Sequence, residues 1–145
     1  MALYNLSRFV EAQRADYARA LEELTNGRKT THWMWYIFPQ LAGLGRSAMS
    51  RTYGIAGIGE ARAYIEHPLL GVRLLACADA LLAVQGRTIT EILGAPDDKK
   101  LRSCATLFAT VTPPGSVFDQ LLAKYHDGQR DQLTLEALRA RGETT

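Results

Sequence analysis

The sequence has few features of the specialised protein classes. It contains two cysteines among 145 residues, which is too few for a small domain held together by disulfides. No window approaches the roughly 18 uncharged apolar residues of a membrane-spanning helix, so we expect no membrane association. The charges nearly cancel, at a net +2, so the clustered basic surface of a nucleic-acid-binding protein is not expected. Strict alternation of apolar and polar residues is also absent, which argues against a β-sheet.

The composition that remains is typical of a soluble globular domain. Hydrophobic residues make up 47% of the chain and charged residues 22%. A chain of this length buries about 70% of the surface that it exposes when unfolded. We therefore expect one domain over residues 1–145, with its core between about residues 6 and 138. The first residues do not combine a basic segment with a following apolar one, so we expect no signal peptide and a cytoplasmic location.

Apolar residues recur at helical spacing along most of the chain, and Gly, Pro and capping residues mark where the helices end. These patterns predict an all-α fold, a compact domain of several short-to-medium amphipathic helices. The predicted bounds are Ser7 (as the N-cap) to Gly27, Pro68 to Gly86, Thr88 (in a capping box with Glu91) to Gly94, Asp97 to Pro113, Ser116 (as the N-cap) to Gly128, and about Thr134 to Arg141.

One segment fits two structures. Residues 33–38 form an unbroken apolar run that suits a buried strand as well as a short buried helix, and periodicity does not distinguish them. Residues 41–61, rich in glycine and small side chains, are predicted to form a loop, with a short helix that starts near Ser47.

Five segments, in this order, resemble the bacterial domain-of-unknown-function family numbered 1810, sometimes labelled calpastatin-like. They are HWMWYIFPQ, GLGRS, the stretch from Tyr53 to Ile55, EARAYIEHPLLGVRLL and DDKKLRSCATLF. The resemblance extends from about Leu6 to Leu138, and its first two segments are specific. It implies a mainly helical fold, which favours a helix at residues 33–38. It assigns no catalytic residue.

The calpastatin label does not fit the composition. Calpastatin inhibitory segments are disordered and low in apolar residues, whereas this chain is 47% hydrophobic and has capped amphipathic helices. We therefore do not expect a protease inhibitor.

Residues 32–53 are the best candidate for a ligand site. Their aromatic side chains could stack a base or nicotinamide ring, and Arg46 with the free N–H groups of a helix starting at Ser47 could hold a phosphate or carboxylate. Asp98, Lys100 and Ser103 could add a second polar edge. The candidate ligand-binding residues are His32, Trp33, Trp35, Gln40, Gly43, Gly45, Arg46, Ser47, Tyr53 and Lys100. The alternative interpretation is core packing of the aromatic segment, joined to a glycine-rich turn in which Ser47 is only a helix cap.

The sequence offers little for metal or covalent chemistry. None of His32, His67 and His126 has the spacing of a zinc site, so no metal site is expected and no cofactor is implied. His126 is predicted in the last turn of a helix, where the dipole favours a cation. Cys77 and Cys104 both fall in apolar helical patterns and are predicted to be buried thiols.

Three functions follow from these observations, and whether the protein is an enzyme stays open. The leading hypothesis is a protein that binds or acts on a phosphorylated or nucleotide-like small molecule, with ADP-ribose or an NAD-derived compound as the first guess. The alternative is a protein-interaction module with a helical groove and no catalysis. Nucleic-acid binding through stacked aromatics is the weakest hypothesis, because the net charge is near zero.

Overall fold

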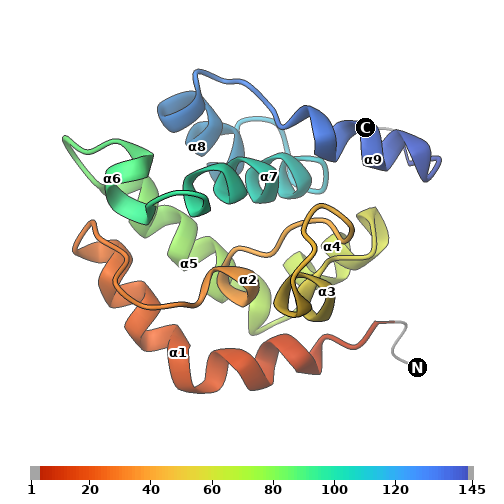
Figure 1. Ribbon diagram of the computed structural model, residues 1–145, viewed down its shortest axis with the longest axis horizontal. Helices are drawn as coiled ribbons and strands as arrows, with labels where there is room; N and C mark the ends of the chain where they lie inside the picture. The colour runs from red at the N-terminus through yellow and green to blue at the C-terminus, as the bar shows by residue number, and fades with distance from the viewer. Residues whose placement is uncertain (1–3, 144–145) are drawn as a thin grey trace.

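The computed structural model describes residues 4–143, and these residues form nine helices with no β-strand (Figure 1). A single parallel β-bridge joins Leu41 to Ile55. None of these helices is both long enough and apolar enough to cross a membrane. The helices are α1 (Ser7–Thr25), α2 (Met34–Ile37), α3 (Ala48–Tyr53), α4 (Ile58–Glu66), α5 (Leu70–Ala83), α6 (Ile89–Leu93), α7 (Asp97–Ala109), α8 (Val117–His126) and α9 (Gln132–Ala140).

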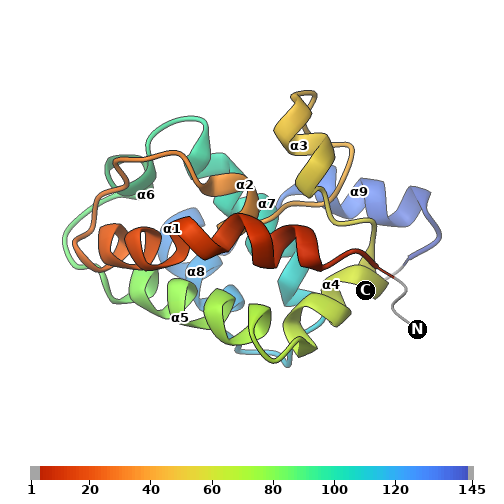
Figure 2. The ribbon, with the colours of Figure 1, turned by 90° about the horizontal axis from the view of Figure 1, so that it is seen from below.

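Helix α5 is the centre of the packing. It contacts α1, α4 and α8, and α7 packs on α8, α6, α9 and α4 (Figures 1 and 2). An aromatic row crosses the core between these layers: Phe9 of α1 meets the edge of Tyr64 at 5.0 Å between ring centroids, Tyr64 lies 5.5 Å from Phe108, and Phe108 lies 5.6 Å from Phe118. The buried hydrophobic residues extend in sequence from Phe9 to Leu138.

The predicted all-α fold is confirmed, and several helix ends lie where local signals placed them. Gly27 follows α1 with a φ of 77°, a left-handed conformation that glycine adopts without strain. The capping box at α6 is present in full, with the Thr88 side chain accepting from the N–H of Glu91 and the Glu91 side chain accepting from the N–H of Thr88. The segment that fitted two structures is helical, as α2.

The predicted ends of α5 and the predicted cap of α1 are wrong. Ser7 is the first residue of α1 instead of its cap, and its hydroxyl donates to Asn5. Helix α5 begins at Leu70, because Pro68 lies in the preceding turn, and it ends at Ala83, before Gly86. Ser116 is the N-cap residue of α8, as predicted, but its hydroxyl makes no capping hydrogen bond and is bonded to that of Thr112 instead.

The last helix also begins earlier than predicted, at Gln132. Its cap is Asp131, whose carboxylate accepts from the N–H of Thr134. Thr134, the predicted start, is therefore inside the helix and fully buried.

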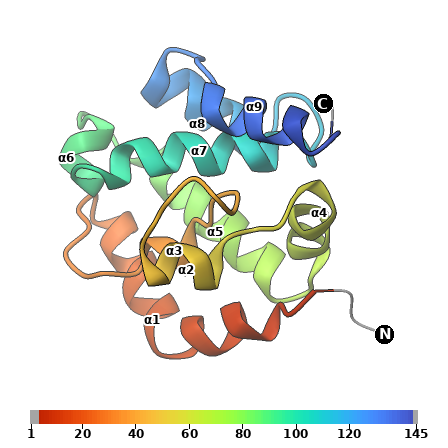
Figure 3. The ribbon, with the colours of Figure 1, turned by 45° about the vertical axis from the view of Figure 1, so that its right-hand side comes forward.

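Helix α4 was missed because residues 54–61 have the composition of a loop. Its N-cap is Gly57, which has no side chain to cap the helix. The missing acceptor comes from the far end of the chain: the carboxylate of Glu143 accepts from the N–H of Ile58 at 2.9 Å. Figure 3 shows α9 and α4 at the same end of the molecule. No local pattern could reveal a cap that lies 85 residues away.

His67 lies in the turn before α5, whose N-cap residue is Leu69, and its side chain supplies the acceptor for the N–H groups at the start of that helix. Its Nδ1 accepts from the N–H groups of Leu69 and Leu70, both at 3.1 Å. We predict that His67→Ala lowers the free energy of unfolding by about 1 kcal/mol, the usual cost of removing a helix cap. Urea denaturation at pH 7 measures this, and His67→Asn, which can still accept from the same N–H groups, should recover part of the loss. Wild-type stability in His67→Ala would contradict the capping role.

Candidate functional site

The cleft that includes three of the predicted site residues lies between two connecting segments of the fold. One segment is the α1–α2 connection with the start of α2, and the other is the α6–α7 connection with the first turn of α7. A larger cleft, of about 490 Å³, lies at residues 102 and 129–133 and includes no predicted site residue. A hydrogen bond of 2.7 Å from the N–H of Lys29 to the carbonyl of Ile92 joins the α1–α2 connection to α6, and Figure 2 shows this connection passing α6. The volume of the cleft between the two connections is about 390 Å³, within the range of small-molecule sites. The lining residues are Lys29, Thr30, Thr31, His32, Met34, Trp35, Leu93, Ala95, Pro96, Asp97 and Lys100.

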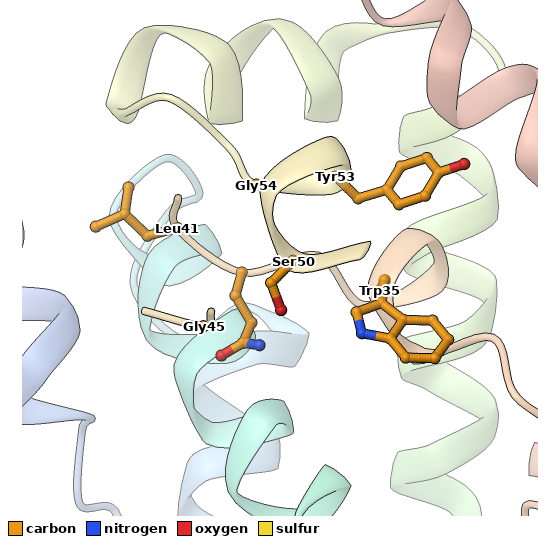
Figure 4. Close-up of a pocket in the computed structure, with 7 residues that line it drawn as sticks. Trp35, Leu41, Gly45, Ser50, Tyr53 and Gly54 are labelled. Carbon is orange, nitrogen blue, oxygen red and sulfur yellow. The ribbon is translucent and has the colours of Figure 1, made fainter. Parts of the chain in front are cut away.

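A second, smaller cavity lies on the other side of Trp35. It is lined by Trp35, Gln40, Leu41, Gly45, Ser50, Tyr53 and Gly54. In Figure 4, Ser50 and Tyr53 project from α3 and Trp35 from α2 around this space. Its volume is about 10 Å³, which is room for about one water molecule and for no larger ligand.

The structure divides the predicted site residues between these two places. His32, Trp35 and Lys100 line the cleft, although Lys100 is 65 or more positions from the other two in sequence. Trp35, Gln40, Gly45 and Tyr53 line the small cavity. Trp33, Gly43, Arg46 and Ser47 line neither of them.

Trp33 is a core residue. Its side chain is fully buried, its ring lies 6.3 Å from that of Phe38, and its indole N–H donates to Glu23 at 2.9 Å. A ligand ring could not stack on Trp33 without displacing these contacts. Of the two tryptophans, only Trp35 is partly exposed.

The predicted anion pocket at Ser47 has a different arrangement. Ser47 caps α3 and accepts from the N–H of Ser50, so its hydroxyl is already used. Arg46 is exposed, and its carbonyl accepts from the side chain of Arg51. Gly43, with a φ of 94°, turns the chain before α3. Because α3 has only six residues, its dipole is also short.

The second polar edge is only partly present. Lys100 reaches the cleft, but Asp98 accepts from Thr90 and is not among the lining residues. Ser103 is buried on the side of α7 that faces α9, where it donates to Asp131 at 3.1 Å. Of these three residues of α7, the cleft therefore includes only Lys100.

Sequence reasoning missed the residue that organises one wall of the cleft, Glu23. One carboxylate oxygen accepts from the N–H groups of Thr30 (2.7 Å) and Thr31 (3.1 Å) and from the indole of Trp33 (2.9 Å), and the other accepts from the Thr31 hydroxyl (2.6 Å). Burial alone would raise the pKa of Glu23, but these hydrogen bonds outweigh burial and lower it to about 2. The signal in the sequence was a glutamate on the α1 face that buries Ala20 and Leu24.

Glu23 should make stability depend on acid. Its pKa is lower in the folded state than its ordinary value of 4.5, so its stabilisation is complete above about pH 4.5 and is lost as the pH falls towards 2. We predict that wild type exceeds Glu23→Gln in free energy of unfolding by about 2 kcal/mol at pH 7, and that the difference shrinks below about pH 4.5 and is largely lost only as the pH reaches about 2. Urea denaturation across this range measures it. A difference that stays constant with pH would contradict the role of the carboxylate charge.

The charges in the cleft centre on Asp97. One of its oxygens is 3.0 Å from the ammonium of Lys29 and the other is 3.7 Å from that of Lys100. The ammonium groups also lie over aromatic rings, Lys29 at 5.1 Å from the Trp33 ring and Lys100 at 5.5 Å from the Trp35 ring. The floor of the cleft therefore carries two positive charges and one negative charge, held beside an indole.

The other reactive side chains do not form a second site. Burial raises the pKa of Cys77 to about 12 and also raises that of Cys104, so both are the inert thiols predicted. Burial, followed by the neighbouring charge of Arg102, lowers the pKa of His126. Burial therefore acts against the positive charge that the helix dipole favours at this position. Within residues 4–143, no group of three or more His, Cys, Asp or Glu could hold a metal ion.

Comparisons with known proteins agree with the fold. No curated protein matches the chain. The crystal structure of the conserved hypothetical protein Rv1873 from Mycobacterium tuberculosis is similar, with a TM-score of 0.93 and 49% sequence identity over 95% of this chain and 99% of that one. The sequence profile of the family described as protein of unknown function (DUF1810) matches residues 3–138, and the chain belongs to this family.

Proposed function

We propose that the protein binds a small phosphorylated or nucleotide-like molecule in the cleft between residues 29–35 and 93–100. The observation that carries the proposal is the position of Lys100, whose ammonium is held between Asp97 and the Trp35 ring at a cleft of about 390 Å³. An ammonium group binds phosphate or carboxylate, and the indole and the Ala95-Pro96 segment offer apolar surface to a ring. His32 and the two threonines add polar groups along the rim.

The test is thermal unfolding of the full chain against AMP, ADP, NAD, ADP-ribose, ribose 5-phosphate and inorganic phosphate. A ligand at 100 times its Kd stabilises the fold by about 2.7 kcal/mol, which is a rise in Tm of about 5–10 °C for a domain of this size. We predict such a rise for at least one organic phosphate in the panel. Lys100→Ala should weaken binding at least tenfold, because it removes the more exposed of the two cations in the cleft.

Lys99→Ala is the matched control. Lys99 is the neighbouring lysine on α7, it is exposed, and it does not line the cleft, so its removal changes the net charge equally. No rise in Tm across the panel, or equal loss of affinity in the two variants, would contradict the proposal. A loss of affinity in Arg46→Ala, with none in Lys100→Ala, would place the ligand at α3 instead.

The alternative of a partner-binding helical module has less support. The large hydrophobic side chains that are exposed among the described residues are Val72 and Leu75 on α5 and Leu133 on α9. Such a small exposed apolar set is ordinary for a globular protein. We therefore propose the small-molecule function.

A further inference from the structure

The positive charge available to a ligand in the cleft is small. The side chain of Lys29 is only 7% exposed, and its ammonium is already paired with Asp97 at 3.0 Å. The side chain of Lys100 is 24% exposed and lies 3.7 Å from the other oxygen of Asp97. Two ammonium groups and one carboxylate leave a net charge of one, which the charge of one phosphate monoester at pH 7, about −1.5 to −2, already exceeds, so a second phosphate would find no further positive charge in the cleft.

Asp97 also limits which group of the ligand can lie next to the acidic group that Lys100 binds. The 3.7 Å between one of its carboxylate oxygens and the ammonium of Lys100 is beyond hydrogen-bond distance, so the ion pair leaves the oxygen able to accept a hydrogen bond. A hydroxyl group of a ligand could donate to this oxygen. A second phosphate in the same place would meet a like charge, which is unfavourable in a partly buried cleft.

We infer that the ligand of the cleft carries a single phosphate next to sugar hydroxyls, as a nucleoside monophosphate or sugar monophosphate does, and is not a diphosphate such as ADP-ribose or NAD. This inference rests on the proposed function and narrows it. Lys100 binds the phosphate, Asp97 accepts from a sugar hydroxyl, and a ring, where the ligand has one, lies between Trp35 and Pro96.

Isothermal titration of the full chain with a graded series tests the assignment. The probes are adenosine, AMP, ADP, ADP-ribose and the 2′,3′-dideoxy form of AMP. We expect AMP to bind about tenfold more tightly than adenosine, which lacks the phosphate, and about tenfold more tightly than ADP or ADP-ribose, which place a second charge near Asp97. The dideoxy form should also bind more weakly than AMP, because it lacks the hydroxyl donors.

A variant changes the charge without changing the shape. Asp97→Asn should reduce or reverse the preference of AMP over ADP, whereas Asp98→Asn, a neighbouring carboxylate bonded to Thr90 and outside the cleft lining, should leave the preference unchanged. If Asp97→Asn does not fold, the ligand series on the wild-type protein still decides the question. Tighter binding of ADP or ADP-ribose than of AMP would overturn this inference and leave the proposed function in place. No binding by any organic phosphate would overturn the proposed function itself.

Discussion

Glu23→Ala is expected to lower the free energy of unfolding by about 4 kcal/mol. The substitution leaves the N–H groups of Thr30 and Thr31 and the indole N–H of Trp33 without their acceptor. Each buried donor that loses its partner costs about 1–3 kcal/mol. The total stays below the sum because an opened loop admits water to part of this cluster. Urea denaturation at pH 7 measures the loss as a lower midpoint with little change in slope.

Two further variants separate the causes. Glu23→Gln keeps an oxygen that can accept from the same N–H groups, so it should lose only about 2 kcal/mol, the part that depends on charge. Glu22→Ala removes the adjacent carboxylate, which is exposed on the same helix, and should change stability by less than about 0.5 kcal/mol. Equal effects of Glu22→Ala and Glu23→Ala would contradict the role of Glu23 in holding residues 30–33.

Glu23 also shows why the cleft could not be assembled from the sequence. The sequence pointed to the aromatic segment and to Lys100, and both contribute to the cleft. It could not show that a buried carboxylate of α1 fixes the backbone before that segment, since the contact is between separate elements. Lys29 and Asp97, which are paired across the cleft, lie 68 positions apart, and such a pair leaves no local pattern.

Whether the side chains of Trp33 and Trp35 lie on the same face depends on whether residues 33–38 form a helix or a strand. Residues at i and i+2 point to the same face of a strand, but about 200° apart around a helix. Trp33 is the N-cap of a helix that begins at Met34, so Trp33 and Trp35 do not share a face as they would in a strand, and one is fully buried while the other is partly exposed. The family resemblance favoured a helix, and the consequence for the two rings could have been drawn from it.

Helix ends were predictable where their cap lies within one turn, as at Thr88 and Gly27, and were missed where the acceptor is distant or the backbone packs closely. The start of α5 was missed because the backbone packs closely there. Its first turn follows directly on the end of α4, and Gly71 is buried there. A hydrophobic pattern records which side chains face the core, but it does not record how closely two backbones approach.

Gly71→Ala is expected to lower the free energy of unfolding by about 3 kcal/mol or more. A methyl group at this position would lie 2.9 Å from the carbonyl carbon of Ile65 and closer still to its oxygen, and a backbone group cannot rotate away. Intrinsic helix propensity acts in the opposite direction, since alanine exceeds glycine by about 1 kcal/mol inside a helix. A net loss in urea denaturation therefore measures the close approach of α4 and α5 and cannot come from propensity.

Gly59→Ala isolates the propensity. Gly59 lies inside α4 and is exposed, and a methyl group there would approach only the side chain of Tyr4, whose hydroxyl end can move aside. Gly59→Ala should therefore match the wild-type protein or gain up to about 1 kcal/mol. A gain in stability in both variants would contradict the close approach of the α4 and α5 backbones at Gly71 and Ile65. A loss of stability in Gly71→Ala together with no loss in Gly59→Ala would instead show that steric contact with Ile65 determines the effect at Gly71. Only the surroundings of the added methyl group differ between the two variants.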